Sequence, residues 1–210
     1  GITKYDRVPF PFATTRQFIG EDLEARILRD GEEIACNVVL CDPNPLVPTR
    51  NSGQCSGLLD YAIFGGLVFR VLSEPYLEDT FGENWSTQTC CGLTEILYSG
   101  GRDFPDEQVV VLSSVFAHTI NIGYHEVRHC RLKSLTVAGQ LVRIRNLRHL
   151  VELVETSEDE FLRFEFFPRG FSLVPGVIIL ERAAVNAAQE DILSSSKIFE
   201  AVRISEGPSA

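Results

Sequence analysis

The chain has 210 residues, of which 44% are hydrophobic and 23% are charged. This composition excludes a generally disordered or collagen-like protein, and the length allows one ordinary domain or two small ones. A chain of this size buries enough surface to fold without disulfides or a metal. The 29 acidic and 19 basic residues give a net charge of −10. That balance argues against nucleic acid as the main partner, because phosphate binding needs a concentrated basic face.

The cysteines and the two ends of the chain give compartment clues. The six cysteines show no Cys-x-x-Cys spacing and include the vicinal pair Cys90-Cys91, so we expect no zinc finger or thioredoxin-type site. Mostly reduced thiols fit the cytosol, nucleus or an organelle better than a secreted protein. No apolar run approaches the ~20 residues that span a bilayer, and no signal or transit peptide is visible. Because the chain contains no methionine, we expect that a segment before Gly1 was removed.

The first informative segment predicts a β-hairpin. Two alternating stretches within residues 23–40 flank Asp30-Gly31, a dipeptide that tolerates the positive φ of a tight turn. A short helix is expected before it, over residues 14–19. Three prolines within residues 41–49, followed by a cluster of glycine and serine, predict an extended linker and a domain boundary.

The second region predicts short strands and a few helices. An amphipathic helix is expected where Leu147, Leu150, Val151 and Val154 share one face and Asn146 occupies the N-cap position. This pattern predicts the α+β class, mainly β, as a partly open small β-barrel or sandwich capped by helices. The other expected strands cover residues 61–72 with a step at Gly65-Gly66, 108–116, 131–142 with a turn at Gly139, 161–167 and 176–182; a polar, glycine-containing segment covers 74–85, and helices cover 92–98 and 183–193.

Residues 125–129, HEVRH, match the HExxH motif, in which two histidines one helical turn apart bind zinc and the glutamate acts as a base. His149, Glu152 and Glu155 are candidates for the third ligand that a catalytic zinc needs. The motif lies between two strand-like segments, with room for barely two helical turns. We therefore interpret it as a solvated turn and expect no metal.

Asn51-Ser52-Gly53 is similar to the motif around a serine-protease nucleophile. No glycine precedes Asn51, Gln54 replaces the second glycine, and all four histidines follow Ser52, opposite to the order of chymotrypsin-like chains. We interpret this segment as part of the linker. We expect no catalytic residue and no cofactor in the chain.

A set of residues suited to peptide binding is better supported than either of these catalytic motifs. Phe64, Gly65 and Gly66 would form a turn whose backbone N–H groups converge on a peptide carboxylate. The strand that follows would offer an edge to which an extended peptide adds, and the amphipathic helix would supply an apolar wall. These are the parts of a PDZ-type site; the alternative is a buried strand with a bulge at the glycines. The edge would come from Leu67, Val68 and Phe69, and the wall from Leu150, Val151 and Val154, with Arg148 beside them.

Collinear segments over most of the chain resemble the C-terminal region of plant-type Deg proteases of the HtrA (protease Do-like) family. These segments include ILRDGEE, YAIFGGLVFRVLSEPYL, EQVVVLSS, INIGY, NLRHLVELVE and FLRFEF. The resemblance implies a PDZ-like fold preceded by a partial PDZ domain, and that the trypsin-like protease domain of such proteins has no counterpart here. The implied plan is residues 1–45 as the C-terminal half of a first PDZ-like domain, 46–57 as a linker, 58–193 as a second PDZ-like domain and 194–210 as a polar tail.

The resemblance implies a function in protein–protein contacts. The second PDZ-like domain is expected to bind peptide C-termini or neighbouring subunits, and the chain to be an oligomer or a subunit of a larger organellar assembly. The alternative is that the chain is the regulatory C-terminal part of an ATP-independent Deg-type serine protease. Either way, the resemblance implies a chloroplast or mitochondrial location, soluble or peripheral, and the short apolar runs predict no transmembrane segment.

Overall fold

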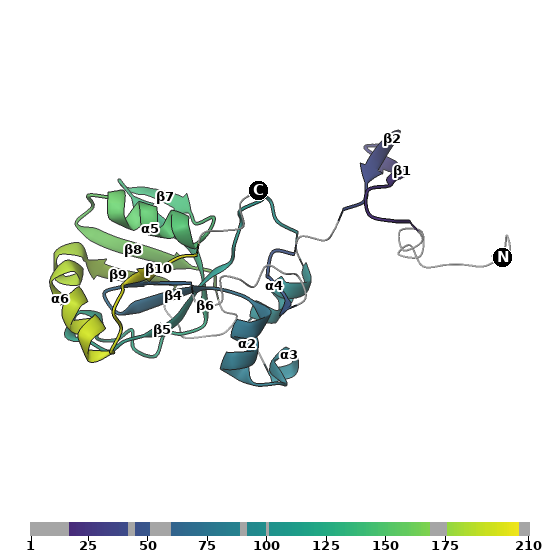
Figure 1. Cartoon of the computed structure of the whole chain (residues 1–210). Helices are drawn as coiled ribbons and strands as arrows, with labels where there is room; N and C mark the ends of the chain where they lie inside the picture. The colour runs from purple at the N-terminus through teal and green to yellow at the C-terminus, as the bar shows by residue number, and fades with distance from the viewer. Residues whose placement is uncertain are drawn as a thin grey trace. The chain divides into compact units, whose positions relative to one another are not determined.

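The computed structural model describes residues 17–41, 45–50, 60–88, 92–99, 101–168 and 176–205. The chain divides into two compact units, residues 1–44 and 45–210, which are described separately. Figure 1 shows the helices and strands of both units. Of the helix expected over residues 14–19, the first three residues lie outside the described part, and Gln17–Gly20 form a bend and a turn. The Cys90-Cys91 pair also lies outside the described residues.

Unit 1 contains the predicted hairpin. Strands β1 (Asp22–Arg29) and β2 (Glu32–Val39) pair antiparallel along their whole length. Asp30 has φ 53° and Gly31 has φ 85°, as a two-residue turn with two positive φ values requires. The hairpin prediction is confirmed. Three directly opposed pairs put apolar side chains on one face: Leu23 with Val38, Ala25 with Cys36, and Ile27 with Ile34.

Unit 2 is built on one antiparallel sheet of eight strands. The strand order is β10-β3-β4-β5-β6-β8-β9, with β7 paired to β6 off this path. Over the described residues the sheet does not close into a barrel, and the expected α+β, mainly β class is confirmed. The strands are β3 (Tyr61–Phe64), β4 (Leu67–Val71), β5 (Val110–Val115), β6 (Cys130–Val137), β7 (Gln140–Arg143), β8 (Phe161–Phe166), β9 (Val177–Glu181) and β10 (Val202–Arg203).

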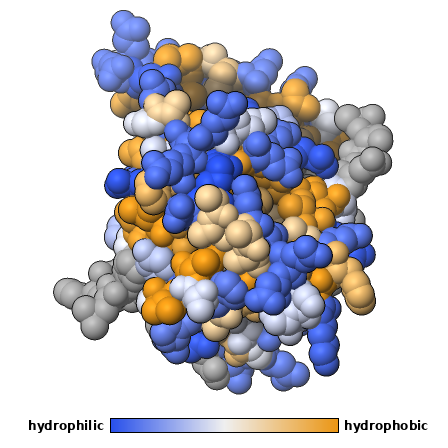
Figure 2. Space-filling view, turned by 90° about the vertical axis from the view of Figure 1, so that its left-hand side faces the viewer, coloured by the Kyte–Doolittle hydropathy of each residue, from blue (hydrophilic) through white to orange (hydrophobic). Residues whose placement is uncertain are grey.

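Two longer helices cover the sheet of unit 2. In α5 (Leu147–Thr156) the Asn146 side chain caps the first turn by accepting from the His149 backbone N–H, as the sequence predicted. In α6 (Arg182–Ser195) the buried positions are Val185, Ala188 and Ile192. Figure 2 shows that hydrophilic side chains interrupt the hydrophobic ones on the side where α6 lies in Figure 1. No helix among the described residues is long and apolar enough to cross a membrane.

A helix that we did not expect, α2 (Glu74–Phe81), replaces the predicted polar segment. Its N-cap Ser73 accepts from the Tyr76 backbone N–H, and Pro75 lies in the first turn, where a missing N–H does no harm. Its buried residues are the consecutive Pro75, Tyr76 and Leu77, and within the helix only Asp79 is exposed. Two shorter helices follow, α3 (Trp85–Gln88) and α4 (Leu93–Ser99), the second of which was predicted.

The core of unit 2 has two apolar clusters. The larger lies between the sheet and α5, and includes Phe69 and Phe164, whose ring centroids are 5.1 Å apart. The smaller gathers around α2. Leu46 and Val47, expected at the start of an extended linker, are 8% and 0% exposed and belong to this second cluster. The proline-rich segment therefore begins as packed structure; residues 51–59 lie outside the described part.

Candidate peptide-binding groove

The glycine pair forms the two-residue turn between β3 and β4. Gly65 and Gly66 have φ 56° and 87°, which glycine adopts without strain. The Gly65 N–H donates to the Gln189 side-chain oxygen at 3.0 Å. The Asn121 side-chain N–H donates to the Gly65 carbonyl at 2.8 Å. The turn is thus held by side chains from α6 and from the loop after β5, and the N–H of Gly65 already has an acceptor.

Strand β4 is not an edge strand. It pairs with β3 through contacts such as Leu67 with Phe64, and with β5 through contacts such as Leu67 with Val115. Our expectation that Leu67, Val68 and Phe69 provide an open edge is therefore wrong. A continuous apolar run indicates a buried strand but does not reveal how many neighbours it has. The register shifts between Val68 and Phe69, which face Ser114 and Leu112, so the extra residue of the bulge is Ser113 on β5 and the bulge does not lie at the glycines.

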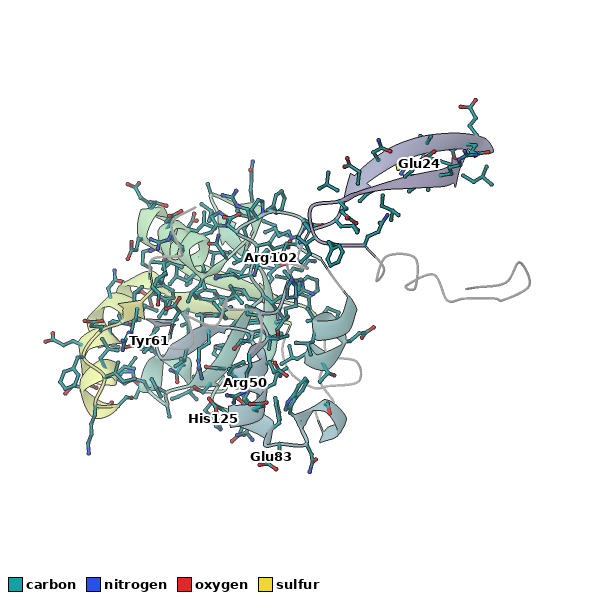
Figure 3. All side chains as sticks on the ribbon, turned by 45° about the vertical axis from the view of Figure 1, so that its right-hand side comes forward. Glu24, Arg50, Tyr61, Glu83, Arg102 and His125 are labelled. Atoms are coloured by element: carbon teal, nitrogen blue, oxygen red, sulfur yellow. The ribbon has the colours of Figure 1, made fainter. Side chains whose placement is uncertain are left out.

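The outer edge of β3 is the one that receives an added strand. Strand β10 pairs there antiparallel, with Val202 opposite Ala62 and Arg203 opposite Tyr61. The Ile63 N–H donates to the Ala201 carbonyl at 2.8 Å. The Tyr61 hydroxyl, located in Figure 3, donates to the Glu200 carbonyl at 3.2 Å. The chain's own C-terminal segment thus adds to β3 in the way that an extended peptide adds to a sheet edge.

Side chains of this C-terminal segment alternate between the core and solvent. Val202 and Ile204 are partly buried and pack against the larger apolar cluster, whereas Arg203 is exposed. At the end of the segment, the buried Asp60 accepts from both the backbone N–H and the hydroxyl of Ser205. We expected only a polar tail here. The alternation of apolar and polar residues over 202–205 is the signal that indicates a strand.

The α5 residues that we expect to form the apolar wall of the peptide site lie in the larger apolar cluster. Leu150, Val151 and Val154 on α5 are 0%, 7% and 5% exposed and belong to the apolar cluster that Val202 and Ile204 join. The last turn of α5 is fixed by Arg182, whose guanidinium donates to the Val154 carbonyl at 2.8 Å. The structure therefore brings β3, α5 and the C-terminal segment together. The peptide-binding role of these residues stays a prediction.

Comparison with known proteins decides the family. The family model described as PDZ domain matches residues 48–204. The chain belongs to the PDZ domain family. The PDZ fold that the resemblance implied is thereby confirmed.

The PDZ chain is similar to plant proteins of the protease Do-like group. It is 36% identical over 188 residues to "Protease Do-like 2, chloroplastic" of Arabidopsis thaliana, covering 90% of this chain and 28% of that protein. It is 31% identical over 199 residues to "Putative protease Do-like 3, mitochondrial" of the same plant, covering 95% and 31%. For "Protease Do-like 4, mitochondrial" the identity is 32% over 160 residues, covering 76% and 26%. The chain spans less than a third of the length of these relatives.

The HEVRH motif of this PDZ chain is not a helix. Residues 125–129 form a turn before β6, and His129 has φ 55°. The His129 Nδ1 is 2.7 Å from the hydroxyl oxygen of the buried Tyr76, and its ring lies 5.1 Å from that of Phe81. His129 therefore packs against α2, whereas His125, labelled in Figure 3, has an exposed side chain. Among the described residues no group of three His, Cys, Asp or Glu side chains is placed to hold a metal.

His149, a candidate zinc ligand in the sequence, has a hydrogen-bond partner within its own helix start. On α5, the His149 Nδ1 accepts from the Arg145 backbone N–H at 3.3 Å. Burial, followed by the nearby positive charge of Arg145, lowers the pKa of His149. The lowered pKa favours the neutral ring, whose Nδ1 accepts this hydrogen bond at the start of the helix. Asn51-Ser52-Gly53 lies outside the described residues.

Proposed function

We propose that this PDZ domain is a non-catalytic interaction module that captures an extended protein segment along the outer edge of β3. The observation that carries the proposal is the antiparallel pairing of β10 with β3. It supports an edge that is competent for strand addition, with the buried α5 residues Leu150, Val151 and Val154 behind it. Backbone hydrogen bonds supply affinity in this mode of recognition, and alternate side chains supply specificity.

The short length of β10 favours its exchange with a partner segment. Only two residue pairs join β10 to β3. A tethered segment nevertheless has an effective concentration in the millimolar range, so a partner in solution must bind well to replace it. We infer that the outer edge of β3 is occupied by the chain's own C-terminal segment until a partner with better contacts arrives.

A test uses a peptide with the sequence of residues 200–206, acetylated and amidated, and measures its binding by fluorescence anisotropy. We expect the double substitution Val202→Ser and Ile204→Ser to loosen the C-terminal segment and to strengthen binding of the peptide at least about 10-fold over the parent chain. The matched control is Phe199→Ser, because Phe199 is 100% exposed in the same region. Absence of peptide binding to the doubly substituted chain, with its fold intact by circular dichroism, would contradict strand capture on β3.

The second candidate is that the module regulates a serine protease within one longer polypeptide. The relatives are named protease Do-like, and the chain spans less than a third of each of those compared above. Captured segments would then be substrates or neighbouring subunits, in a chloroplast or mitochondrion as the relatives' names indicate. Sequencing the transcript upstream of Gly1 separates the two: a nucleophilic serine with upstream histidine and aspartate supports the protease, and their absence supports a scaffold subunit.

A further inference from the structure

We propose that Asp60 makes the groove selective for an internal segment that carries serine or threonine, and unfavourable for a segment that ends there in a free carboxylate. This inference rests on the proposed function, since it names the kind of segment that adds to β3. It differs from our sequence-based expectation of peptide C-termini as ligands.

The geometry where the added segment meets Asp60 is specific. Asp60 immediately precedes β3 and is 7% exposed. Its Oδ1 accepts from the Ser205 backbone N–H at 2.8 Å and from the Ser205 Oγ at 2.7 Å. Because β10 runs antiparallel to β3, the added segment runs toward Asp60 as it proceeds to its own C-terminus.

An ionised carboxylate only accepts hydrogen bonds, so Asp60 favours binding of a ligand that presents hydrogen-bond donors. A backbone N–H and a hydroxyl on the same ligand residue are two such donors, and bonds to a charged acceptor are short and strong. A ligand that ended at this residue would instead place its own carboxylate close to that of Asp60. Like charges in a partly buried site repel each other. Asp60 also offers the ligand carboxylate a hydrogen-bond acceptor, whereas a carboxylate needs donors.

The remaining positions define a ligand pattern. Val202 and Ile204 pack against the core, and Arg203 points to solvent. The preferred segment is therefore apolar, any residue, apolar, then serine or threonine, with the chain continuing beyond it. The C-terminal segment of this protein, Val202 to Ser205, fits that pattern.

The test measures amide hydrogen exchange of Ile63, whose N–H donates to the Ala201 carbonyl and so reports attachment of the segment. In the full chain, Ser205→Ala should speed exchange of Ile63 roughly 10-fold, as expected for loss of a hydrogen bond to a charged group, whereas Ser205→Thr should preserve protection. A chain that ends at Ser205 should exchange faster than the full chain at low ionic strength. A chain that ends at residue 208 is the matched control for shortening alone.

Asp60→Asn separates charge from packing, because the amide oxygen still accepts hydrogen bonds without the negative charge. We expect this substitution to weaken protection of Ile63 in the full chain but to restore it in the chain that ends at Ser205. The inference is overturned if that shortened chain is as protected as the full chain, or more so, or if Ser205→Ala leaves exchange unchanged. If the peptide of residues 200–206 binds equally well with alanine in place of its serine, strand capture stands and the selectivity fails. If no peptide binds, both fail.

Discussion

Gly66 occupies a position that no other residue fits. Its φ is +87°, and a Cβ there would lie 2.5 Å from the Phe116 carbonyl oxygen and 2.5 Å from the Asn121 side-chain nitrogen. We expect Gly66→Ala to be more destabilising than Gly139→Ala by about 1–3 kcal/mol, the usual range for overpacking. Gly139 is the matched control, since it also has positive φ, +76°, but open space around its Cβ. Urea unfolding checks this, and equal losses in the two variants would show that backbone strain alone matters.

His149 gives the domain a pH dependence of known sign. Its pKa is lowered by burial and by Arg145, so the unfolded chain binds a proton at this residue more readily than the folded one. The free energy of unfolding therefore falls as pH drops below the ordinary histidine pKa of about 6.5 toward the lower folded value. His149→Gln should flatten this part of the profile measured by urea unfolding at a series of pH values. Parallel profiles for parent and variant would contradict the assignment.

At the scale of elements, the start of α5 depends on one side chain. The Asn146 Oδ1 accepts from the His149 backbone N–H at 2.7 Å, and the Asn146 amide also donates to Asp106. We expect Asn146→Ala to cost about 0.5–2 kcal/mol of unfolding free energy, as for other N-caps. Asn146→Ser keeps a capping oxygen and should recover most of it. If the serine variant is as unstable as the alanine variant, the bond to Asp106 and not the cap is responsible.

Elements with strong local signals were predictable from the sequence, and those defined by distant partners were not. Helix α5 has an N-cap and a regular apolar face, and β8 alternates cleanly, so both were predicted. Helix α2 was missed because its polar residues mask the buried face, although Ser73 and Pro75 are start signals. The neighbours of β3 and β4 were not predictable, because β10 and β5 come from far along the chain. Sequence pattern gives a strand's burial but not its neighbours.

On the scale of the whole molecule, the pairing of β3 with β10 joins parts of unit 2 that are far apart in the sequence. Among the described residues of unit 2, the first strand, β3, pairs with the last, β10, and Asp60 just before β3 accepts from Ser205, which follows β10. Loosening the C-terminal segment therefore removes contacts from the beginning of the domain as well as from its end. Capture of a partner on β3 would replace these contacts, so the domain need not lose stability when its own segment leaves.

The division into two units predicts that residues 45–210 fold without the preceding residues. Every residue of both apolar clusters lies in unit 2, and the described part of unit 1 is a hairpin, which is marginal alone. Trp85, the single tryptophan, is buried in the second cluster, so its fluorescence follows unit 2. We expect the shortened chain to unfold in urea at the same midpoint, with the same slope, as the full chain. Ile27→Ser in the full chain is the control, because it alters only the hairpin. A lower midpoint at unchanged slope in the shortened chain would mean that unit 1 stabilises the PDZ domain.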